Sequence, residues 1–320
     1  MDTRGLELVQ IAGFGRSSST LLGMMLGAQR GFMYLGELEN LWARGLVQNR
    51  LCSCGAPLRA CPFWLKVFQH AFGGIDRIDP HTLEDMRWAH ARKWRLLGFS
   101  LTGRAHRARA TPDAYQDLIL RLLRAARDVS GCQTMVDSSG SAAQAALVGS
   151  LPGVDLRLLH LLRDPRGVAY SMMKRKKHQP DQDGRKYWMV RTKPGRTAVD
   201  WCVRNAGLEL VARPLGGAEW VRYEDWIDDP GGALPTWFPV DAGLGGERGA
   251  WRFTPSPGHV ATANPVRFAR DPLVLELDSA WQTGLSAASF RLVTLITCPL
   301  LLRYGYQPGA GRSTWVQLAE

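Results

Sequence analysis

The sequence predicts an α/β fold in which helices flank a parallel sheet and one helical insertion is added. Short apolar runs recur along the chain, and each is followed by polar or glycine-containing residues and then by a helical pattern. This strand–turn–helix alternation is typical of parallel sheets with crossover helices. With 320 residues, 45% of them hydrophobic, the chain is long enough to bury a sizeable core. It shows no internal repeat and no clear linker, so we expect one domain over residues 1–320.

Four apolar runs are expected to be buried strands of the sheet. They are Leu6–Ala12, Thr134–Val136, Leu156–Leu162 and Trp220–Tyr223. A helix-like run, Leu21–Ala28, follows the first strand after a glycine- and serine-rich loop. A further apolar stretch, Leu292–Leu302, is about half the ~20 residues of a membrane span, so we expect a buried helix there.

Three further segments are expected outside the sheet. A mostly helical insertion should occupy about residues 40–130, and its clearest helix ends at Gly131, the residue type preferred beyond a helix C-terminus. Residues 174–196 are rich in Lys and Arg and predict a basic lid, although a solvated loop is the usual fate of such a run. The Gly- and Pro-rich segment Pro235–Pro257 predicts irregular structure.

The charge and the cysteine content limit the classes of function. The net charge of +11 implies an affinity for anions. The basic run lacks interleaved aromatic residues and any nucleic-acid-binding motif, which argues against nucleic acid. The N-terminal stretch has no cleavage-site pattern, and six cysteines in this length do not suggest a disulfide framework. We therefore expect a cytoplasmic protein without a membrane span; its oligomeric state cannot be read.

The loop after the first strand, GFGRSSSTLLG, resembles a phosphate-binding loop without its lysine. A Walker loop reads GxxxxGK[ST]. Aligning it with residues 13–20 keeps Gly13 and Thr20, but Ser18-Ser19 replaces the Gly-Lys pair. Backbone N–H groups and a helix N-terminus still form an anion site, and Arg16 can add a bidentate contact. The loop therefore predicts a P-loop-NTPase-like fold with anion binding by Gly15, Arg16, Ser17, Ser18, Ser19 and Thr20, the alternative being a serine-rich helix cap without a ligand.

A second candidate anion site follows the third expected strand. In LRDPRGVAYS, Arg163 comes directly after the strand and Ser171 lies about two helical turns later. Ligands of open α/β sheets gather at the carboxyl ends of the strands, where the first loop also lies. Two anion sites at one edge predict a ligand with two phosphate-like groups, although an Arg-Asp pair capping a helix is the alternative.

Together these motifs resemble the sulfotransferases that use 3′-phosphoadenosine 5′-phosphosulfate (PAPS), in the bacterial branch related to the tyrosylprotein sulfotransferases. The resemblance extends in order over nearly the whole chain through LGELENLW, CSCGAPLRACPFW, VDSSGS, TAVDWCVRNAGLEL, VRYEDW and ANPVRF. It implies PAPS as the donor, no required metal, and a small-molecule, carbohydrate or lipid acceptor with a hydroxyl or amine. The other candidates are a P-loop-type nucleotide kinase or NTPase and a non-catalytic nucleotide-binding protein.

The resemblance also implies roles for individual residues. Arg16 to Thr20 would hold the 5′-phosphosulfate, and Arg163 and Ser171 the 3′-phosphate. Glu37 would be the catalytic base, with Glu39 as the fallback; its apolar surroundings predict a raised pKa, and capping of the next helix is the alternative role. Tyr223 would lie near the adenine unless it is a core residue, and Asn264 and Arg267 would close over the cofactor.

One position departs from the family pattern. Where the family often has DSSK, with a lysine expected to stabilise the sulfuryl group, this chain has Gly140. Arg16, Ser138 and Ser139 could suffice, a cation could come from the run 174–177, or the activity could be weak.

Cys52, Cys54 and Cys61 leave three alternatives open. With a fourth ligand such as His70 they would hold a structural zinc; otherwise they form a disulfide or pack as free thiols.

Overall fold

The computed structural model describes residues 5–91, 113–174 and 189–309. The strands are β1 (Leu6–Gly13), β2 (Phe32–Gly36), β3 (Thr134–Asp137), β4 (Val154–Leu162), β5 (Glu219–Arg222), β6 (Leu244–Gly245), β7 (Arg252–Phe253) and β8 (Leu273–Val274). The α-helices are α1 (Ser19–Gly27), α2 (Pro62–Phe72), α3 (Pro80–His90), α6 (Ala114–Ser130), α7 (Ala142–Gly149), α8 (Pro165–Met173), α9 (Pro194–Ala212), α10 (Tyr223–Asp228), α11 (Pro230–Ala233), α12 (Trp281–Gly284) and α13 (Ala287–Arg303).

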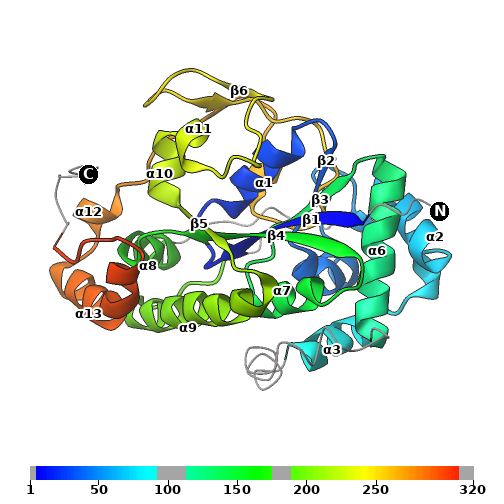
Figure 1. Cartoon of the computed structure of the whole chain (residues 1–320), viewed down its shortest axis with the longest axis horizontal. Helices are drawn as coiled ribbons and strands as arrows, with labels where there is room; N and C mark the ends of the chain where they lie inside the picture. Colours follow the sequence, from blue (N-terminus) through cyan, green and yellow to red (C-terminus); the bar gives the residue numbers. More distant parts are fainter. Residues whose placement is uncertain (1–4, 92–112, 175–188, 310–320) are drawn as a thin grey trace.

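The main sheet has five parallel strands in the order β2-β3-β1-β4-β5. Helices cover both of its faces, with α1 on one side and α7 and α9 on the other (Figure 1). The predicted α/β fold with a P-loop-like first strand, loop and helix is confirmed. Parallel order matters for function because it brings the ends of β1, β3 and β4 to one edge.

The alternation of side chains along β1 explains why this strand lies in the centre. Val9 and Ile11 are buried against α1, while Ala12 is buried with Leu158 and Leu208 against α7 and α9. Successive side chains of a strand point to opposite faces, so a strand covered on both sides is expected to be largely apolar. β1 has the sequence LELVQIAG, and its buried polar side chain, Gln10, donates to the Ser139 carbonyl at 3.0 Å.

The second strand in chain order was not expected. Residues Phe32–Gly36 form β2, which pairs with β3, so the helical insertion follows β2 rather than β1. A five-residue apolar run cannot be distinguished from a helix segment by periodicity alone. The insertion itself is helical, with α2, α3 and α6 packed beside the sheet (Figure 1). Its longest helix, α6, starts at a capping box on Asp113 and ends at Gly131, whose φ is 69°.

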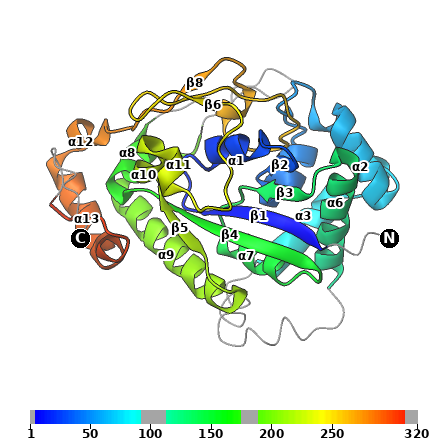
Figure 2. The ribbon, with the colours of Figure 1, turned by 45° about the horizontal axis from the view of Figure 1, so that its top comes forward.

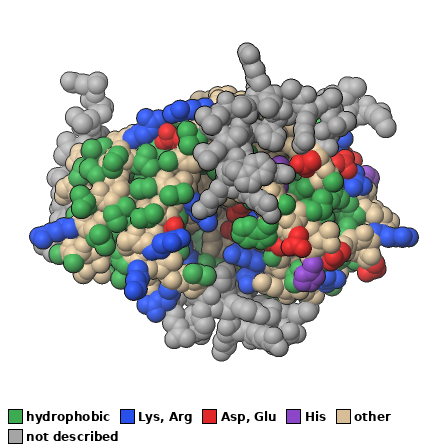
Figure 3. All heavy atoms as spheres, turned by 90° about the horizontal axis from the view of Figure 1, so that it is seen from below, with side chains coloured by type: hydrophobic (Ala, Val, Ile, Leu, Met, Phe, Trp, Pro, Cys, Tyr) green, Lys and Arg blue, Asp and Glu red, His purple; other side chains and the backbone are tan. Residues whose placement is uncertain are grey.

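Two expectations about the later part of the chain require correction. α13 is not a buried helix: Leu292, Leu295 and Leu302 are exposed, because only one face of the helix packs against α8 and α9. On the side of the molecule seen in Figure 3, apolar side chains gather over these helices. Residues 235–257 are not wholly irregular, since β6 and β7 form an antiparallel sheet with β8. No described helix is long and apolar enough to cross a membrane.

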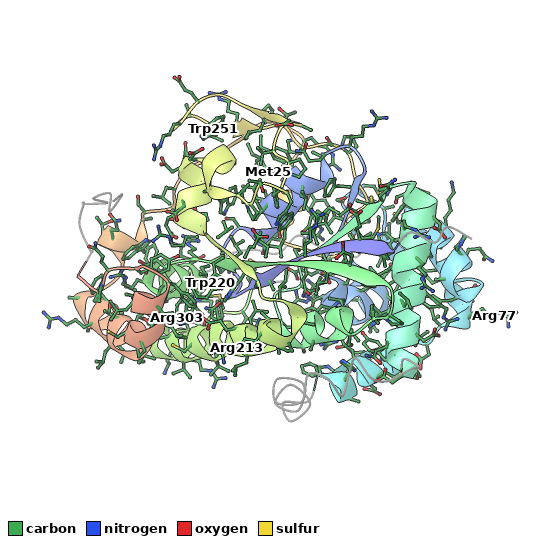
Figure 4. The ribbon with its side chains drawn as sticks, viewed as in Figure 1. Met25, Arg77, Arg213, Trp220, Trp251 and Arg303 are labelled. Carbon is green, nitrogen blue, oxygen red and sulfur yellow. The ribbon has the colours of Figure 1, made fainter. Side chains whose placement is uncertain are left out.

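The small sheet β6–β8 lies over α1, on the face opposite α7 and α9 (Figure 2). Its Phe253 belongs to the same buried cluster as Met25 of α1. Figure 4 places Met25 and Trp251 on this side of the main sheet and Trp220 with Arg303 on the other, where the guanidinium lies 5.2 Å from the ring centroid. The two faces of the main sheet are thus both covered by packed layers.

Candidate functional site

The loop between β1 and α1 holds an unusual backbone conformation. Arg16 and Ser18 have φ of 74° and 65°, although neither is glycine. Left-handed conformations at non-glycine residues are uncommon and carry local strain, which folds retain mostly at functional sites. Among the described residues, no hydrogen bond uses the backbone N–H of any residue from Gly15 to Ser18. The loop thus offers a series of N–H groups to an anion.

The serines of the loop do not cap α1. Ser18 occupies the N-cap position, but its side chain makes no capping hydrogen bond. The Ser17 hydroxyl donates to the carbonyl of Phe14 at 2.9 Å. Because the Ser18 side chain does not cap the first N–H groups of the helix, the alternative of a serine-rich helix cap is not observed. The positive end of the helix dipole faces the loop.

Arg163 joins the second motif to this loop. Its Nη1 donates to the carbonyl oxygen of Arg16 at 2.7 Å, and its Nη2 pairs with the Asp278 carboxylate at 3.1 Å. The side chain is 6% exposed, yet its Nε has no hydrogen-bond partner within the described residues. A buried, unused N–H of a charged group is rare and marks a place where a ligand can bind.

The Arg-Asp pair at this motif involves a different arginine. Asp164 caps α8 and binds the Arg166 guanidinium at 2.9 and 2.7 Å. Arg166 also donates to the carbonyls of Gln307 and Pro308. The capping alternative therefore applies to Arg166 and leaves Arg163 for another role.

Arg16 is a cation with little to neutralise it. Burial and the neighbouring Arg163 charge lower its pKa, while Glu37 acts in the opposite direction. Its Nη1 contacts the sulfur of Met189 at 3.0 Å, a weak acceptor, and within the described residues it forms no ion pair. Arg16 and Arg163 lie close enough for their charges to interact, and an anion bound between them would be favoured by both.

Glu37 lies beside this pair, directly after β2. Its carboxylate accepts from Asn40 at 2.7 Å and lies 3.7 Å from Arg44. Burial raises the pKa of Glu37 to about 7. This effect is larger than the opposing effect of the Arg44 and Arg267 charges, which lower the pKa. The side chain makes no capping hydrogen bond to the following turn, so the capping role is not observed. A carboxylate with this pKa can accept a proton near neutrality.

The segment around Thr262 fixes the backbone of Glu37. Thr262 donates its hydroxyl to the Glu37 carbonyl and accepts from the Glu37 N–H, both at 2.6 Å. Gly36, with φ of 99°, approaches so closely that a Cβ would lie 2.3 Å from the Thr262 carbonyl oxygen. The Gly-Glu order is therefore a packing requirement at this crossing, because only glycine tolerates both the space and the φ.

The segment that contains Asn264 and Arg267 lies beside the loop and Glu37. Asn264 donates through its backbone N–H and its side-chain amide to the Thr20 hydroxyl, at 3.2 and 3.3 Å. Arg267 is buried and donates to the carbonyl of Leu51 at 3.1 Å, while its Nε has no partner among the described residues. Burial lowers the pKa of Arg267 to about 10, and the Glu37 charge opposes that shift.

Tyr223 packs against Arg163, and both Tyr223 and Ser171 are buried. The Tyr223 ring lies 4.4 Å from the Arg163 guanidinium, and its hydroxyl accepts from the Asp278 N–H at 3.0 Å. It is thus a core tyrosine with a satisfied hydroxyl that also supports Arg163. Ser171 is 2% exposed on α8. Contact of either residue with a cofactor stays a prediction.

Gly140 has a steric explanation. A Cβ at this position would lie 2.5 Å from the carbonyl oxygen of Gly13, whose N–H bonds to the Gly140 carbonyl at 3.2 Å. No side chain fits there unless the end of β1 moves. The cations of this edge are instead Arg16, Arg163 and Arg267.

The expected zinc ligand His70 does not lie with the cysteines, and the expected basic lid falls only in part within the described residues. His70 is exposed and lies 3.5 Å from Asp128, whereas His259 lies beside the three cysteines. Of the basic lid, residues 175–188 lie outside the described residues; Arg191 and Arg196 bind the Met173 carbonyl and the Asp200 carboxylate.

Comparison with known proteins gives little further guidance. No protein-family model matches the sequence, and the search of curated proteins found no match. One solved structure, the sulfotransferase domain of the olefin synthase from Synechococcus PCC 7002, aligns with a TM-score of 0.46 and 15% identity, over 96% of this chain and 98% of that chain. At this level the likeness identifies neither a family nor a substrate.

Sequence reasoning missed several residues that contact the candidate site, some of them near in sequence and some distant. Asn40 and Arg44 contact Glu37 from the turn that follows it, and their i+3 and i+7 spacing could have indicated this. Thr262 and His259 carry no local signal. Only the fold brings them to their partners.

Proposed function

We propose that the protein is a PAPS-dependent sulfotransferase that transfers a sulfuryl group to a hydroxyl or amine of a small-molecule, carbohydrate or lipid acceptor. The observation that carries the proposal is the contact of Arg163 Nη1 with the Arg16 carbonyl, which joins the two anion motifs. A donor with separate 5′-phosphosulfate and 3′-phosphate groups has two anionic ends to bind. The unused N–H groups of the loop and the unpartnered Nε of Arg163 fit such a donor.

The proposed role of each residue follows from its charge and its hydrogen-bonding groups. Gly15 to Thr20 and Arg16 hold the phosphosulfate, and Arg163 with Ser171 holds the 3′-phosphate. Glu37 accepts the acceptor's proton as the new O–S bond to a hydroxyl, or N–S bond to an amine, forms, and the S–O bond to the phosphate breaks to release 3′,5′-ADP. Arg16 and Arg267 stabilise charge on the transferring group in place of a lysine at position 140. Positioning and electrostatics supply most of the rate, as in phosphoryl transfer.

The surroundings of the loop argue against a nucleotide kinase or NTPase. Such enzymes hold Mg²⁺ with a loop hydroxyl and a nearby carboxylate. Here the Thr20 hydroxyl accepts two hydrogen bonds from Asn264. The carboxylate at the end of the adjacent strand, Asp137, is buried and accepts from Leu38 N–H, from Ser139 and from Gln144. Both groups are occupied by the fold.

The test compares nucleotides and then turnover. We expect 3′,5′-ADP to raise the melting temperature without Mg²⁺ and Mg-ATP to have little effect; the reverse result would favour a kinase. Labelled PAPS with a panel of sugars, lipids, phenols and amines then separates an enzyme from a binding protein. Stabilisation without turnover on any acceptor would support the binding protein.

Glu37 is tested by substitution against a matched glutamate. Glu224 is also buried, and burial raises its pKa to about 7, but it bonds to Asp164 N–H and the Tyr306 hydroxyl. Glu37→Gln should keep 3′,5′-ADP binding and lose turnover, while Glu224→Gln should keep both. For the unmodified protein kcat/KM should rise with pH and level off above about 7, because the base must be ionised. Near-normal turnover of Glu37→Gln would remove Glu37 from the mechanism.

The cytoplasm stays the proposed compartment. None of the six cysteines forms a disulfide, as expected in a reducing environment.

A further inference from the structure

Three cysteines and one histidine converge on a point outside the proposed donor site. The ligand atoms of Cys52, Cys54, Cys61 and His259 all lie within 4.8 Å of one another. The sulfurs of Cys54 and Cys61 are 3.7 Å apart, and the Cys61 sulfur is 3.3 Å from His259 Nδ1. The histidine comes from a segment about 200 residues later in the chain. The cluster is therefore a product of the tertiary fold.

A tight turn presents the cysteines on one side. The N–H of Cys52 bonds to the Ala56 carbonyl and the N–H of Gly55 to the Cys52 carbonyl, both at 2.8 Å. Gly55 has a φ of 93°, which this turn requires. Cys61 directly precedes α2, so its sulfur lies near the positive end of a helix, where a thiolate is stabilised.

His259 is held in place from two directions. Its ring stacks on Phe63 with centroids 5.2 Å apart and an interplanar angle of 12°. Its carbonyl accepts from Trp64 Nε1 at 2.8 Å. Ser53 hydrogen-bonds to Gly258 and to Val260 on both sides of it. The imidazole therefore faces the sulfurs without having to be drawn there by an ion.

We propose that Cys52, Cys54, Cys61 and His259 bind a structural Zn²⁺. In a tetrahedral site with Zn–S of about 2.3 Å and Zn–N of about 2.0 Å, two sulfurs lie about 3.8 Å apart and sulfur and nitrogen about 3.5 Å apart. The Cys54–Cys61 sulfur separation of 3.7 Å and the separation of 3.3 Å between the Cys61 sulfur and His259 Nδ1 match these values. Three thiolates and one imidazole are soft ligands that select zinc over magnesium or calcium.

The site has the character of a structural rather than a catalytic centre. Four protein ligands complete the tetrahedron, which leaves no position for water or substrate. Cys52 and Cys61 are fully buried. A disulfide would require sulfurs about 2.05 Å apart and would leave one thiol and the histidine unused.

The ion would join two segments that are distant in the sequence and that meet near Glu37. One is the cysteine turn, and the other runs from Gly258 to Thr262, whose last residue holds the Glu37 backbone. The inference itself does not depend on the proposed sulfuryl transfer, because the metal is measured directly.

The experiment measures zinc in the full-length protein purified without chelators. We expect about one zinc per chain by elemental analysis, and the visible absorption of tetrahedral thiolate-bound Co²⁺ after exchange. Cys54→Ser and His259→Ala should each lose at least tenfold in zinc affinity. The matched controls Cys132→Ser and His70→Ala, which leave the cluster intact, should keep the full content.

Several results would overturn the inference. The first is a zinc content no higher than background in the unmodified protein after reconstitution with excess zinc. The second is a Cys54–Cys61 disulfide, detected by mass spectrometry in the freshly purified protein. Equal zinc in the ligand and control variants would contradict the assignment of the ligands. Because a ligand variant can misfold, the Co²⁺ titration of the unmodified protein decides the matter independently of any substitution.

Discussion

Arg163 and Arg166 follow the same strand, three residues apart, but the fold uses their guanidinium groups differently. Arg166 is 1% exposed and its donors bind Asp164 and two main-chain carbonyls. Arg163 is nearly as buried, yet its Nε is left without a partner in the described part of the chain. Both side chains bear the desolvation cost of burial, but only one of them is compensated in full.

The residues around Arg163 and around Arg166 differ in the same way. Around Arg166, the polar groups of Asp164, Glu224 and Tyr306 bond to one another. Around Arg163, the loop N–H groups are unused and Arg16 has a sulfur atom as its partner. Several unsatisfied groups lie together at this loop, which favours ligand binding there. In this respect the candidate site differs from the network around Arg166.

The largest expected effect is on stability at the satisfied arginine. Arg166→Met leaves the Asp164 carboxylate buried without its partner, so the free energy of unfolding should fall by about 3–5 kcal/mol. Urea unfolding measures it. Arg248→Met, which breaks an ion pair whose arginine is 70% exposed, is the control and should cost far less, because solvent screens an exposed pair. Equal losses would mean that the buried network adds nothing.

The next effect is on binding at the unsatisfied arginine. Arg163→Gln should weaken 3′,5′-ADP binding by about 2 kcal/mol or more, roughly thirtyfold, because a desolvated charge contact to the ligand is lost. Calorimetric titration measures the affinity, and urea unfolding should show a smaller change than for Arg166→Met. Unchanged affinity together with a large loss of stability would contradict the distinction between the two arginines.

The two glutamates test the comparison through pH. Burial raises the pKa of both Glu37 and Glu224 from 4.5 to about 7. Between these values the folded protein binds more protons than the unfolded chain, so stability falls as pH rises through this window. Each shift corresponds to at most about 3 kcal/mol. Glu37→Gln and Glu224→Gln should both be more stable than the unmodified protein at pH 8, by similar amounts, and the gain should vanish at pH 4.

Unfolding in urea at the two pH values gives these numbers. The comparison sharpens if the two variants gain equal stability but only Glu37→Gln loses turnover. A loss of stability in either variant at pH 8 would show that its carboxylate charge is favourable in the folded state.

The smallest effect is expected at the junction of the strand ends. Gly140→Ala places a Cβ 2.5 Å from the Gly13 carbonyl oxygen, and the required shift should cost about 1–3 kcal/mol. Gly245→Ala, where the added atom meets nothing within 4 Å, is the control and should change stability by less than about 0.5 kcal/mol. A neutral Gly140→Ala would show that this edge is free to adjust.

The sequence predicted the features of the fold that depend on local pattern. β1, β3 and β4 contain the short apolar runs that predicted them, β5 lies within one residue of the predicted Trp220–Tyr223, and the loop and Arg163 follow their strands directly. β2 was missed because five apolar residues fit a helix equally well. The burial of α13 was overestimated because composition does not reveal which side of an apolar helix meets a partner.

The candidate site was predicted as two separate motifs, and the structure brings them into contact. The arrangement of Glu37 with Thr262 and of the cysteines with His259 could not be predicted, since each joins residues about 200 positions apart. The same holds for Gly140, which looked like the loss of a lysine. Its reason lies in the backbone of Gly13, and no property of position 140 alone reveals it.

The crossing of Gly13 and Gly140 also constrains how this sequence can change. A Cβ on Gly13 would lie 2.2 Å from the Leu161 carbonyl oxygen, so the strand end of β1 is wedged between its two neighbours. A lysine at position 140 therefore requires the end of β1 to shift between its two neighbours. We expect its cost to fall if a second substitution widens the spacing of these three strands.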